Sequence, residues 1–512
     1  MPPRSTIVRF TVTFGGILLL ANYLFGPTLL REPNPYLIPH YRDDARFENG
    51  HFLSHSNWTV PALSELDYIE QLFLKSYNDY RSYLKRQSKT YSQAVSNYKK
   101  RYKRNPPAGF EKWYNHAKWR GCLVIDDYDV IEESIAPFRS LTPAAIKLRI
   151  KELRKHDKKH RIGEILIRGG TVANITEGLW QMIGWDGFVG NLPDMDILFN
   201  AWDEPFVLPL DNGTYQPVQF SNAAKKPLWP KVEEQCMSEG KDMGTVDTNG
   251  YLENMAQVKG ALDLCDHPEY ENTHGFFNAP SSLTVTRQLV PIFSIQTVSI
   301  FKDLLLPTSA TFHPNFLDND DVRPFPGKIR KMYWRGSPTG GDLTEKNVLN
   351  GHRVRLALLS QEYNDLVDAK LTTYFGNKKA LKILNDTFGK PQKADKKLEN
   401  DYAYLMDMDG NGQSGRFYRL LRSQAVVFKL TAFKQWHDDR LFPWVHYVPV
   451  KLGMPDMVDI LKWMSGTERG WELSRRIAEE ADWWARRALR LEDAEVYIYR
   501  MLLEYAELLR EQ

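Results

Sequence analysis

Short apolar runs bounded by turn-forming residues recur after Gly121, and they predict strands that are buried on both faces. The runs fall into two blocks. The first block contains residues 122–125, 165–167, 192–200 and 291–295, and the second contains residues 332–334, 403–406, 426–429 and 446–450. Helix-forming segments intervene, for example from Arg353 to Ser360, and residues 470–509 repeat apolar positions with the period of an α-helix.

Strands that alternate with helices in two blocks predict the α/β fold class, with two Rossmann-like doubly wound domains that face a cleft. We assign residues 106–315 to the first domain, with an irregular insertion over residues 208–282 that is rich in Asn, Gly and Pro. Residues 316–465 form the second domain. Residues 466–512 are expected as C-terminal helices that pack back on the first domain.

The first 30 residues predict a cytosolic tail and a transmembrane signal anchor. Arg4 and Arg9 precede an apolar stretch over residues 10–25, which is slightly short for a span of about 20 residues. No small-x-small cleavage site clearly follows, so an anchor is favoured over a cleaved signal peptide. The positive flank places the N-terminus in the cytosol and the body of the chain in the lumen, in the type II orientation.

Charge adds little to this picture. The 67 Lys and Arg residues nearly balance the 64 Asp and Glu residues, for a net charge of +3, which does not indicate a nucleic-acid partner. One basic run over residues 81–104 has interleaved tyrosines and could be a patch for nucleic acid or anionic lipid. Such runs more often are the solvated face of a helix, and we assign residues 31–105 to a stem.

Cysteines and glycosylation sequons agree with a lumenal body. Cys236 and Cys265 lie in the insertion and could form a disulfide in an oxidising compartment, which leaves Cys122 unpaired. The cysteines have no zinc-site spacing. Candidate N-glycosylation sequons begin at Asn57, Asn174, Asn212 and Asn385.

The most informative motif is DMDGNGQSGRFYRLL at residues 407–421, a glycine-rich loop that runs into an apolar-periodic segment. Ser414 is placed to cap the expected helix, and Arg416 falls in its first turn. The unpaired N–H groups and positive potential of a helix start suit a phosphate or diphosphate. The motif therefore predicts a nucleotide ligand and an enzyme.

The same motif has other interpretations. Asp407, Asp409, Asn411 and Gly412 match the first half of a calcium EF-hand loop, but the twelfth position is Tyr418 instead of Glu, which excludes calcium. The two aspartates could instead hold a divalent metal such as Mn²⁺ against a nucleotide sugar. A glycine-rich connection without any ligand remains the simplest alternative.

Several blocks together carry a resemblance to a known family. They are NPPAGFEKWY (105–114), LFNAWDEPFV (198–207), YWRGSPTGG (333–341), HRVRLALLS (352–360), YLMDMDGNGQSGRFYRLL (404–421) and PWVHYVPVK (443–451). From about Pro106 to its end, the chain resembles the capsule-associated glycosyltransferases of fungi, which share a domain with protein O-glucosyltransferases (glycosyltransferase family 90) and are similar to β-1,2-xylosyltransferases. The resemblance implies a GT-B-like fold with the nucleotide sugar in the cleft between the domains.

The resemblance places the general base on Asp203, in the block WDEP. The residue follows a predicted strand, at the end where open α/β sheets build their sites, and a carboxylate there can accept the proton of an acceptor hydroxyl. Glu204 is the adjacent competitor and is expected to point the opposite way. From local sequence alone, a turn residue before Pro205 is the slightly favoured interpretation of Asp203, and the resemblance reverses that order.

The resemblance also implies which residues bind the UDP-sugar in the second domain. They are Arg335, Ser337, Arg353, Asn411, Gly412, Gln413, Ser414, Gly415 and Arg416. An extra stretch separates Ser337 from Arg353, so Arg355 competes for the same role. His446 and Tyr447 could approach the donor, but buried core positions beside a strand are the favoured interpretation.

The expected activity is the transfer of xylose or glucose from a UDP-sugar to a hydroxyl of a glycan or glycoprotein, with inversion at the anomeric carbon. The first domain then holds the acceptor. No cofactor is expected beyond the UDP-sugar, and no protein metal site. The expected location is the Golgi or ER membrane. Two alternatives remain: a Mn²⁺-dependent transferase that uses Asp407 and Asp409, and a non-catalytic lumenal glycan-binding protein.

Overall fold

The computed structural model describes residues 67–156, 160–175, 187–210, 216–247, 263–312, 317 and 322–511. The chain divides into two units, Met1–Glu65 and Leu66–Gln512, and every described residue belongs to the second unit. The predicted anchor and the sequons at Asn57 and Asn212 lie outside the described residues. Among the residues that are described, no helix combines the length and apolar character needed to cross a bilayer.

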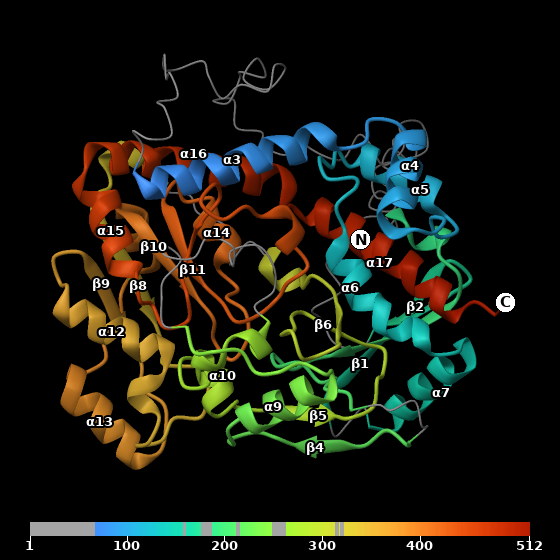
Figure 1. Ribbon diagram of the computed structural model, residues 1–512, viewed down its shortest axis with the longest axis horizontal. Helices are drawn as coiled ribbons and strands as arrows, with labels where there is room; N and C mark the ends of the chain where they lie inside the picture. Colours follow the sequence, from blue (N-terminus) through green and yellow to red (C-terminus); the bar gives the residue numbers. More distant parts are fainter. Residues whose placement is uncertain are drawn as a thin grey trace, which may run out of the picture. The chain divides into compact units, whose positions relative to one another are not determined.

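Apolar runs of the second block form a five-stranded parallel sheet (Figure 1). Its order is β12-β11-β10-β8-β9, with β8 (Ile329–Gly336), β9 (Val367–Leu371), β10 (Tyr402–Met408), β11 (Val426–Leu430) and β12 (Val448–Pro449). The central strands β10 and β11 are almost entirely buried, which explains why their sequences are continuous apolar runs. Helices α12 (His352–Glu362), α13 (Lys378–Phe388) and α14 (Phe417–Leu421) connect successive strands.

The first block forms a mixed sheet instead of a parallel one. Its order is β2-β1-β3-β6-β7, with β1 (Ile162–Arg168), β2 (Thr171–Ile175), β3 (Met195–Asn200), β6 (Ile292–Ser294) and β7 (Leu304–Leu305). Strands β3, β6 and β7 are parallel, but β1 is antiparallel to both β2 and β3. Gly169 and Gly170, both at positive φ, form a two-residue turn that joins β1 and β2 in a β-hairpin. The expectation of parallel strands is wrong for β1.

Residues 122–125, predicted as a strand, are buried but form no sheet. The N–H of Cys122 donates to the carbonyl of Ala117 (3.0 Å) at the end of α5 (Phe110–Trp119). The side-chain oxygen of Gln87 accepts from the N–H groups of Ile125 and Asp126 at 2.8 and 3.0 Å. Hydrogen bonds to a side chain and to a helix end therefore replace the inter-strand hydrogen bonds that the apolar run predicts.

The insertion is held by a small sheet and by a disulfide. Strand β4 (Phe220–Asn222) pairs antiparallel with β5 (Thr284–Thr286). Cys236, in α9 (Trp229–Ser238), is disulfide-bonded to Cys265 with a Cα–Cα distance of 5.7 Å, and Cys122 is buried with a free thiol. These are the partners that the sequence suggested. Asn174 on β2 and Asn385 on α13 are both exposed, as glycosylation requires.

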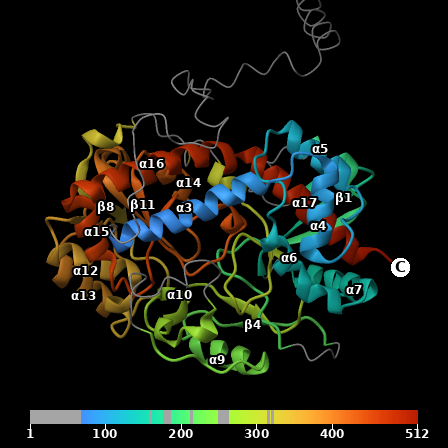
Figure 2. The same ribbon diagram turned by 45° about the horizontal axis from the view of Figure 1, so that its top comes forward.

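Residues expected as a stem are, from Asp67 onward, part of the folded unit. Helix α3 (Tyr68–Arg86) buries Tyr80 and Tyr83, and the Tyr80 ring lies 5.3 Å from both the Phe442 and the Trp484 rings. In Figures 1 and 2, α3 runs along α16 (Glu468–Ala488). The stem assignment is wrong for this part because tyrosines spaced at helical intervals build an apolar stripe that a polar composition hides.

The arginines of the basic run over residues 81–104 form several ion pairs within the same unit. Arg86 and Arg101 pair with Asp127, and Arg101 also pairs with Asp129. Arg104, which follows α4 (Tyr91–Tyr102), pairs with Glu132 (2.6 Å). These ion pairs fasten the N-terminal helices to α6 (Asp129–Ile135) and to the loop before it, so part of the basic run is structural.

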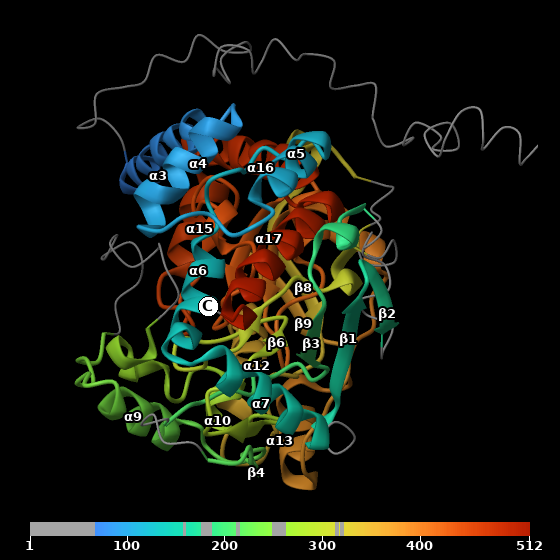
Figure 3. The same ribbon diagram turned by 90° about the vertical axis from the view of Figure 1, so that its right-hand side faces the viewer.

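Three helices complete the chain: α15 (Met457–Gly466), α16 and α17 (Leu491–Leu509). Helix α17 packs against α5, α6 and α7 (Pro143–Leu153) (Figure 3), and the Tyr505 ring lies 5.2 Å from the Phe293 ring of β6. The expected packing on the first sheet is therefore present for α17. Helix α16 instead contacts β11 and α14 of the second sheet.

Replacement of Tyr80 tests whether α3 belongs to the core. Tyr80→Ala should lower the free energy of unfolding by about 3–5 kcal/mol, since it removes a large buried aromatic side chain. The exposed Tyr68 of the same helix is the control, and Tyr68→Ala should cost less than about 1 kcal/mol. Chemical denaturation of both variants makes the comparison. If both variants lose the same small amount of unfolding free energy, α3 is a detachable stem.

Candidate active site

The loops that follow parallel strands of the two sheets meet at one place. Asp203 follows β3 and Gln296 follows β6, whereas Gln413 belongs to the glycine-rich loop after β10. The Gln296 amide donates to the backbone carbonyl of Asp203 (2.5 Å), and its oxygen accepts from the N–H of Gln413. Gln296 is fully buried. One side chain therefore fixes the predicted base against the predicted anion loop.

Gly412 has a different role from the one expected of it. A Cβ atom at this position would lie 2.3 Å from the Gln296 amide nitrogen and 3.1 Å from the Asp203 Cβ. Glycine is therefore required so that the two loops can approach each other. At Gly415 a Cβ atom would meet nothing within 4 Å, so this part of the loop faces open space.

The two consecutive carboxylates of the WDEP block point in opposite directions. Glu204 is 1% exposed and accepts hydrogen bonds from the N–H (3.0 Å) and the hydroxyl of Ser282. Asp203 is exposed. The protein around Asp203 nevertheless raises its pKa by desolvation, and Arg161 partly offsets this effect. A raised pKa makes an ionised carboxylate a better proton acceptor.

Arg353, the second residue of α12, is a buried cation without a carboxylate partner in the described part of the chain. Its guanidinium donates to the carbonyls of Asp409 (2.6 Å), Ser337 (2.9 Å) and Met408 (3.1 Å) and to the Thr339 hydroxyl (2.7 Å). Burial, with a further contribution from Arg416, lowers its pKa to about 9. Because an unpaired buried charge is costly, the arrangement favours an anionic ligand nearby.

Arg416 is the second cation and has most of its donors free. Among the described residues it donates one hydrogen bond, to the carbonyl of Arg335 (2.9 Å). Burial lowers its pKa, while Asp407 opposes the shift. A guanidinium has five N–H donors, so four remain for a ligand. The guanidinium carbons of Arg353 and Arg416 lie 5.7 and 6.0 Å from the Trp334 ring centre. Two guanidinium groups around one indole suit a diphosphate.

The predicted helix cap is wrong. Arg416 is itself the N-cap of α14 and makes no side-chain cap hydrogen bond, and Ser414 contributes only its backbone carbonyl, which lies 3.5 Å from the N–H of Phe417. With five residues, α14 is a single turn with a weak dipole. The attraction for an anion therefore comes mainly from the two arginines.

Other predicted donor residues are engaged with the protein. Arg335 forms an ion pair with Asp368 (2.8 Å). The Asn411 side-chain oxygen accepts from the N–H of Gly340 (3.1 Å) and from the Ser281 hydroxyl (3.0 Å), so Asn411 joins loops from different parts of the chain. Ser337, at the carboxyl end of β8, accepts from the Thr373 hydroxyl (2.7 Å). Of this group, Ser337 lies next to Arg353.

Two residues that competed for a role in donor binding lie in other surroundings. Arg355 donates to backbone carbonyls of Thr273, Leu452 and Asn350, away from the Arg353 partners. His446 is fully buried, and its ring stacks on that of Trp484 at 5.3 Å, as expected for a core residue.

Asp407 and Asp409, the candidate metal pair, are both 1% exposed and are held by neighbouring residues. The Asp407 carboxylate lies 3.3 Å from the Lys429 ammonium, and the Asp409 carboxylate accepts from the N–H of Ala432 (2.7 Å). The described residues contain no cluster of three His, Cys, Asp or Glu side chains arranged to hold a metal ion. A metal at this pair would first have to break both contacts.

Gln296 is the functional position that the sequence did not reveal. Its signal in the sequence is its place shortly after a predicted strand, two residues beyond the end of β6, as Asp203 is three residues beyond the end of β3. Nothing in the local sequence distinguishes it from an ordinary loop residue, because its importance comes from contacts with two distant segments.

Comparison with known proteins agrees with these features. Human protein O-glucosyltransferase 1 is 28% identical over 243 residues, which cover 43% of this chain and 58% of that protein. Rat protein O-glucosyltransferase 3 is 29% identical over 224 residues (43% and 42%). The O-glucosyltransferase rumi homolog of Aedes aegypti is 23% identical over 362 residues (61% and 86%). The chain thus spans little more than half the length of the first of these relatives. A model of the glycosyl transferase family 90 domain matches residues 312–512, and this part of the chain is a glycosyl transferase family 90 domain.

Proposed function

We propose that the chain transfers a sugar from a UDP-sugar to a hydroxyl group of a glycan or glycoprotein. The observation that carries the proposal is a pair of guanidinium groups, Arg353 and Arg416, that have no carboxylate partner among the described residues. Gln296 holds the loop that contains Arg416 against the loop of an exposed carboxylate, Asp203. A diphosphate and a proton acceptor are the two things that such a reaction must hold together. Arg416, Gln413, Ser414 and Gly415 would face the donor, and the two sheets would act as the halves of a GT-B-like enzyme.

The residues support direct displacement with inversion. Asp203 accepts the proton of the acceptor hydroxyl while that oxygen attacks the anomeric carbon. The bond between the anomeric carbon and the phosphate oxygen breaks, and UDP departs with the electron pair. The charge that develops on UDP is stabilised by Arg353 and Arg416, which are preorganised by burial. Arg353 has one free N–H and acts mainly by its charge, whereas Arg416 binds directly.

Glucose and xylose are the proposed donor sugars. The similar proteins are named O-glucosyltransferases, which favours glucose, and the resemblance to fungal xylosyltransferases favours xylose. We further propose a lumenal location in the Golgi or ER, with a type II anchor. The disulfide between Cys236 and Cys265 supports this location, since such bonds persist in oxidising compartments.

Release of UDP from a panel of UDP-sugars tests the function. We expect UDP-glucose or UDP-xylose to be turned over, with and without an added hydroxyl acceptor, and the activity to survive a chelator. Activity that a chelator abolishes and Mn²⁺ restores would replace the proposal with the metal-dependent mechanism. If no UDP-sugar binds or reacts, the chain is not a UDP-sugar transferase.

A further inference from the structure

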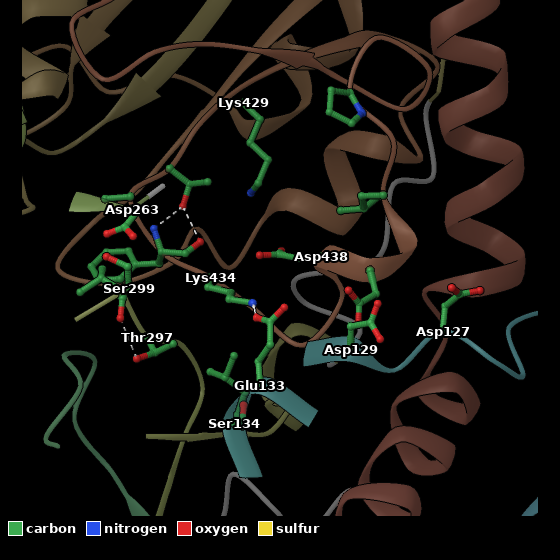
Figure 4. Close-up of a pocket in the computed structure, with 18 of the residues that line it drawn as sticks. Asp127, Asp129, Glu133, Ser134, Asp263, Thr297, Ser299, Lys429, Lys434 and Asp438 are labelled. Atoms are coloured by element: carbon green, nitrogen blue, oxygen red, sulfur yellow. Dashed lines mark hydrogen bonds and ion pairs between the residues drawn. The ribbon is translucent and has the colours of Figure 1, made fainter. Parts of the chain in front are cut away.

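A cavity of about 720 Å³ opens beside the candidate active site (Figure 4). Its walls are the loops after β6 and β11, the end of α3 and the region around α6. Thr297 and Lys434 line it, and their backbones pair at 3.0 and 2.8 Å. Because Thr297 directly follows Gln296, the cavity begins one residue from the contact that positions Asp203. Its volume lies within the range of about 300–1,000 Å³ that encloses small ligands.

The charges around the cavity largely neutralise one another. Five cationic and seven acidic side chains are among the described lining residues. Lys434 pairs with Glu133, and Arg86 and Arg101 pair with Asp127. A strongly charged ligand would meet both signs at close range, so the lining favours a neutral polar one.

Three of the lining groups have hydrogen-bonding capacity that the protein does not use. Lys429 is 6% exposed; among the described residues its ammonium has one hydrogen-bond acceptor, an Asp407 oxygen at 3.3 Å, and it lies 3.7 Å from the centre of the Phe417 ring. Asp438 accepts from the N–H of Gln435 (3.1 Å), and its other oxygen lies 3.8 Å from a ring nitrogen of His437. Asp439 accepts from the N–H of Val130 (2.7 Å). In Figure 4 the Lys429 ammonium and the Asp438 carboxylate point toward the same space. A buried ammonium with one hydrogen bond and one aromatic contact keeps donor capacity for a ligand that accepts hydrogen bonds.

The remaining lining adds hydroxyl groups, from Ser134, Ser299 and Thr431, and aromatic side chains, from Tyr83 and Tyr447. Burial raises the pKa values of Asp438 and Asp439 to about 6, as expected for carboxylates in a wall that excludes much of the water. Donors, acceptors and apolar surfaces thus surround one space. Sugar hydroxyls both donate and accept hydrogen bonds, and sugar rings have apolar faces.

We propose that this cavity binds a neutral oligosaccharide, as a subsite for the part of the acceptor glycan remote from the reacting hydroxyl. The inference rests on the proposed function, because it takes the occupant to be the acceptor. In this subsite Asp438 and Asp439 accept hydrogen bonds from sugar hydroxyls, and Lys429 donates to a sugar oxygen.

Saturation-transfer NMR with mannotriose, xylotriose and maltotriose tests the proposal on the whole chain. At least one trisaccharide should bind, and Asp438→Asn with Asp439→Asn should weaken its binding at least tenfold. The amides keep the oxygens that cap Gln435 and Val130, so the fold should survive. Asp386→Asn, on the exposed face of α13, is the control and should bind as the wild type does.

Calorimetry with UDP separates this proposal from the proposed function. UDP affinity unchanged by the double substitution, together with lost trisaccharide binding, supports the subsite. If the double variant also loses UDP affinity, the single variant Asp438→Asn replaces it in the test. This variant should weaken trisaccharide binding, by less than the double substitution, and should leave UDP affinity unchanged. No trisaccharide binding to the wild type, or equal binding to the variant, would overturn the subsite even if UDP-sugars are turned over.

Discussion

Asp203→Asn is expected to slow sugar transfer by about 10²- to 10⁴-fold, the usual contribution of a general base. The amide keeps the shape of the carboxylate but cannot take the proton of the acceptor hydroxyl. The Gln296 contact is to the backbone carbonyl of Asp203, so the loop should stay in place. UDP affinity should change by less than about threefold, below 1 kcal/mol. Steady-state turnover at saturating UDP-sugar, with calorimetry for UDP, measures both quantities.

Asp194→Asn is the matched control, because Asp194 is an exposed carboxylate at the other end of β3. It should leave turnover unchanged. The pH profile adds a second readout. Protonation inactivates a base, so the rate should fall as the pH falls through the pKa of Asp203. Desolvation raises that pKa, which puts this fall above the ordinary aspartate value of about 3.9. Full activity of Asp203→Asn would eliminate Asp203 as the base.

Arg416→Ala should weaken UDP binding by roughly 10- to 100-fold, because it removes charge-assisted hydrogen bonds worth about 1.5–3 kcal/mol. Arg416 is the better probe of the two arginines, since its one hydrogen bond within the protein is the bond to the Arg335 carbonyl. Arg353 also ties α12 to two other backbone segments, at Ser337 and at Met408 and Asp409, so its loss would disturb the fold. Isothermal calorimetry with UDP gives the affinity directly.

Arg335→Ala provides the contrast in the same region. The Arg335 guanidinium is occupied by Asp368, which also accepts from the Tyr402 hydroxyl (2.9 Å) and so keeps a partner after the substitution. The Arg335 carbonyl that receives the Arg416 hydrogen bond is unchanged. UDP affinity should therefore be close to that of the wild type. Equal losses for both variants would point to general disruption of the loop, and no loss for Arg416→Ala would remove the anion site.

The parallel sheet of the second half was predictable because strands buried on both faces are nearly continuous apolar runs, as in β10 and β11. Strand β9 was missed since its sequence, VDAKL, alternates polar and apolar residues at the edge of the sheet. The β1–β2 hairpin had a usable signal in Gly169 and Gly170. Helix α3 also had a usable sequence signal, the helical spacing of its tyrosines.

The candidate site was predictable only for residues that belong to a local sequence motif. Asp203, Arg353 and Arg416 stand in recognisable blocks, and the structure brings their loops together. The bridging role of Gln296, the packing role of Gly412 and the engagement of Arg335 depend on segments far apart in sequence, for which local patterns carry no information. The cap by Ser414 failed because one short turn, with Arg416 at its N-cap, replaces the expected helix.

A crystal structure of the chain with bound UDP is the decisive test of the proposed site. The diphosphate should lie against the Arg416 guanidinium, within reach of the Arg353 charge, and the leaving oxygen should face the Asp203 carboxylate. UDP bound elsewhere, with Arg416 still unpaired and Asp203 remote from the phosphates, would contradict the proposed site.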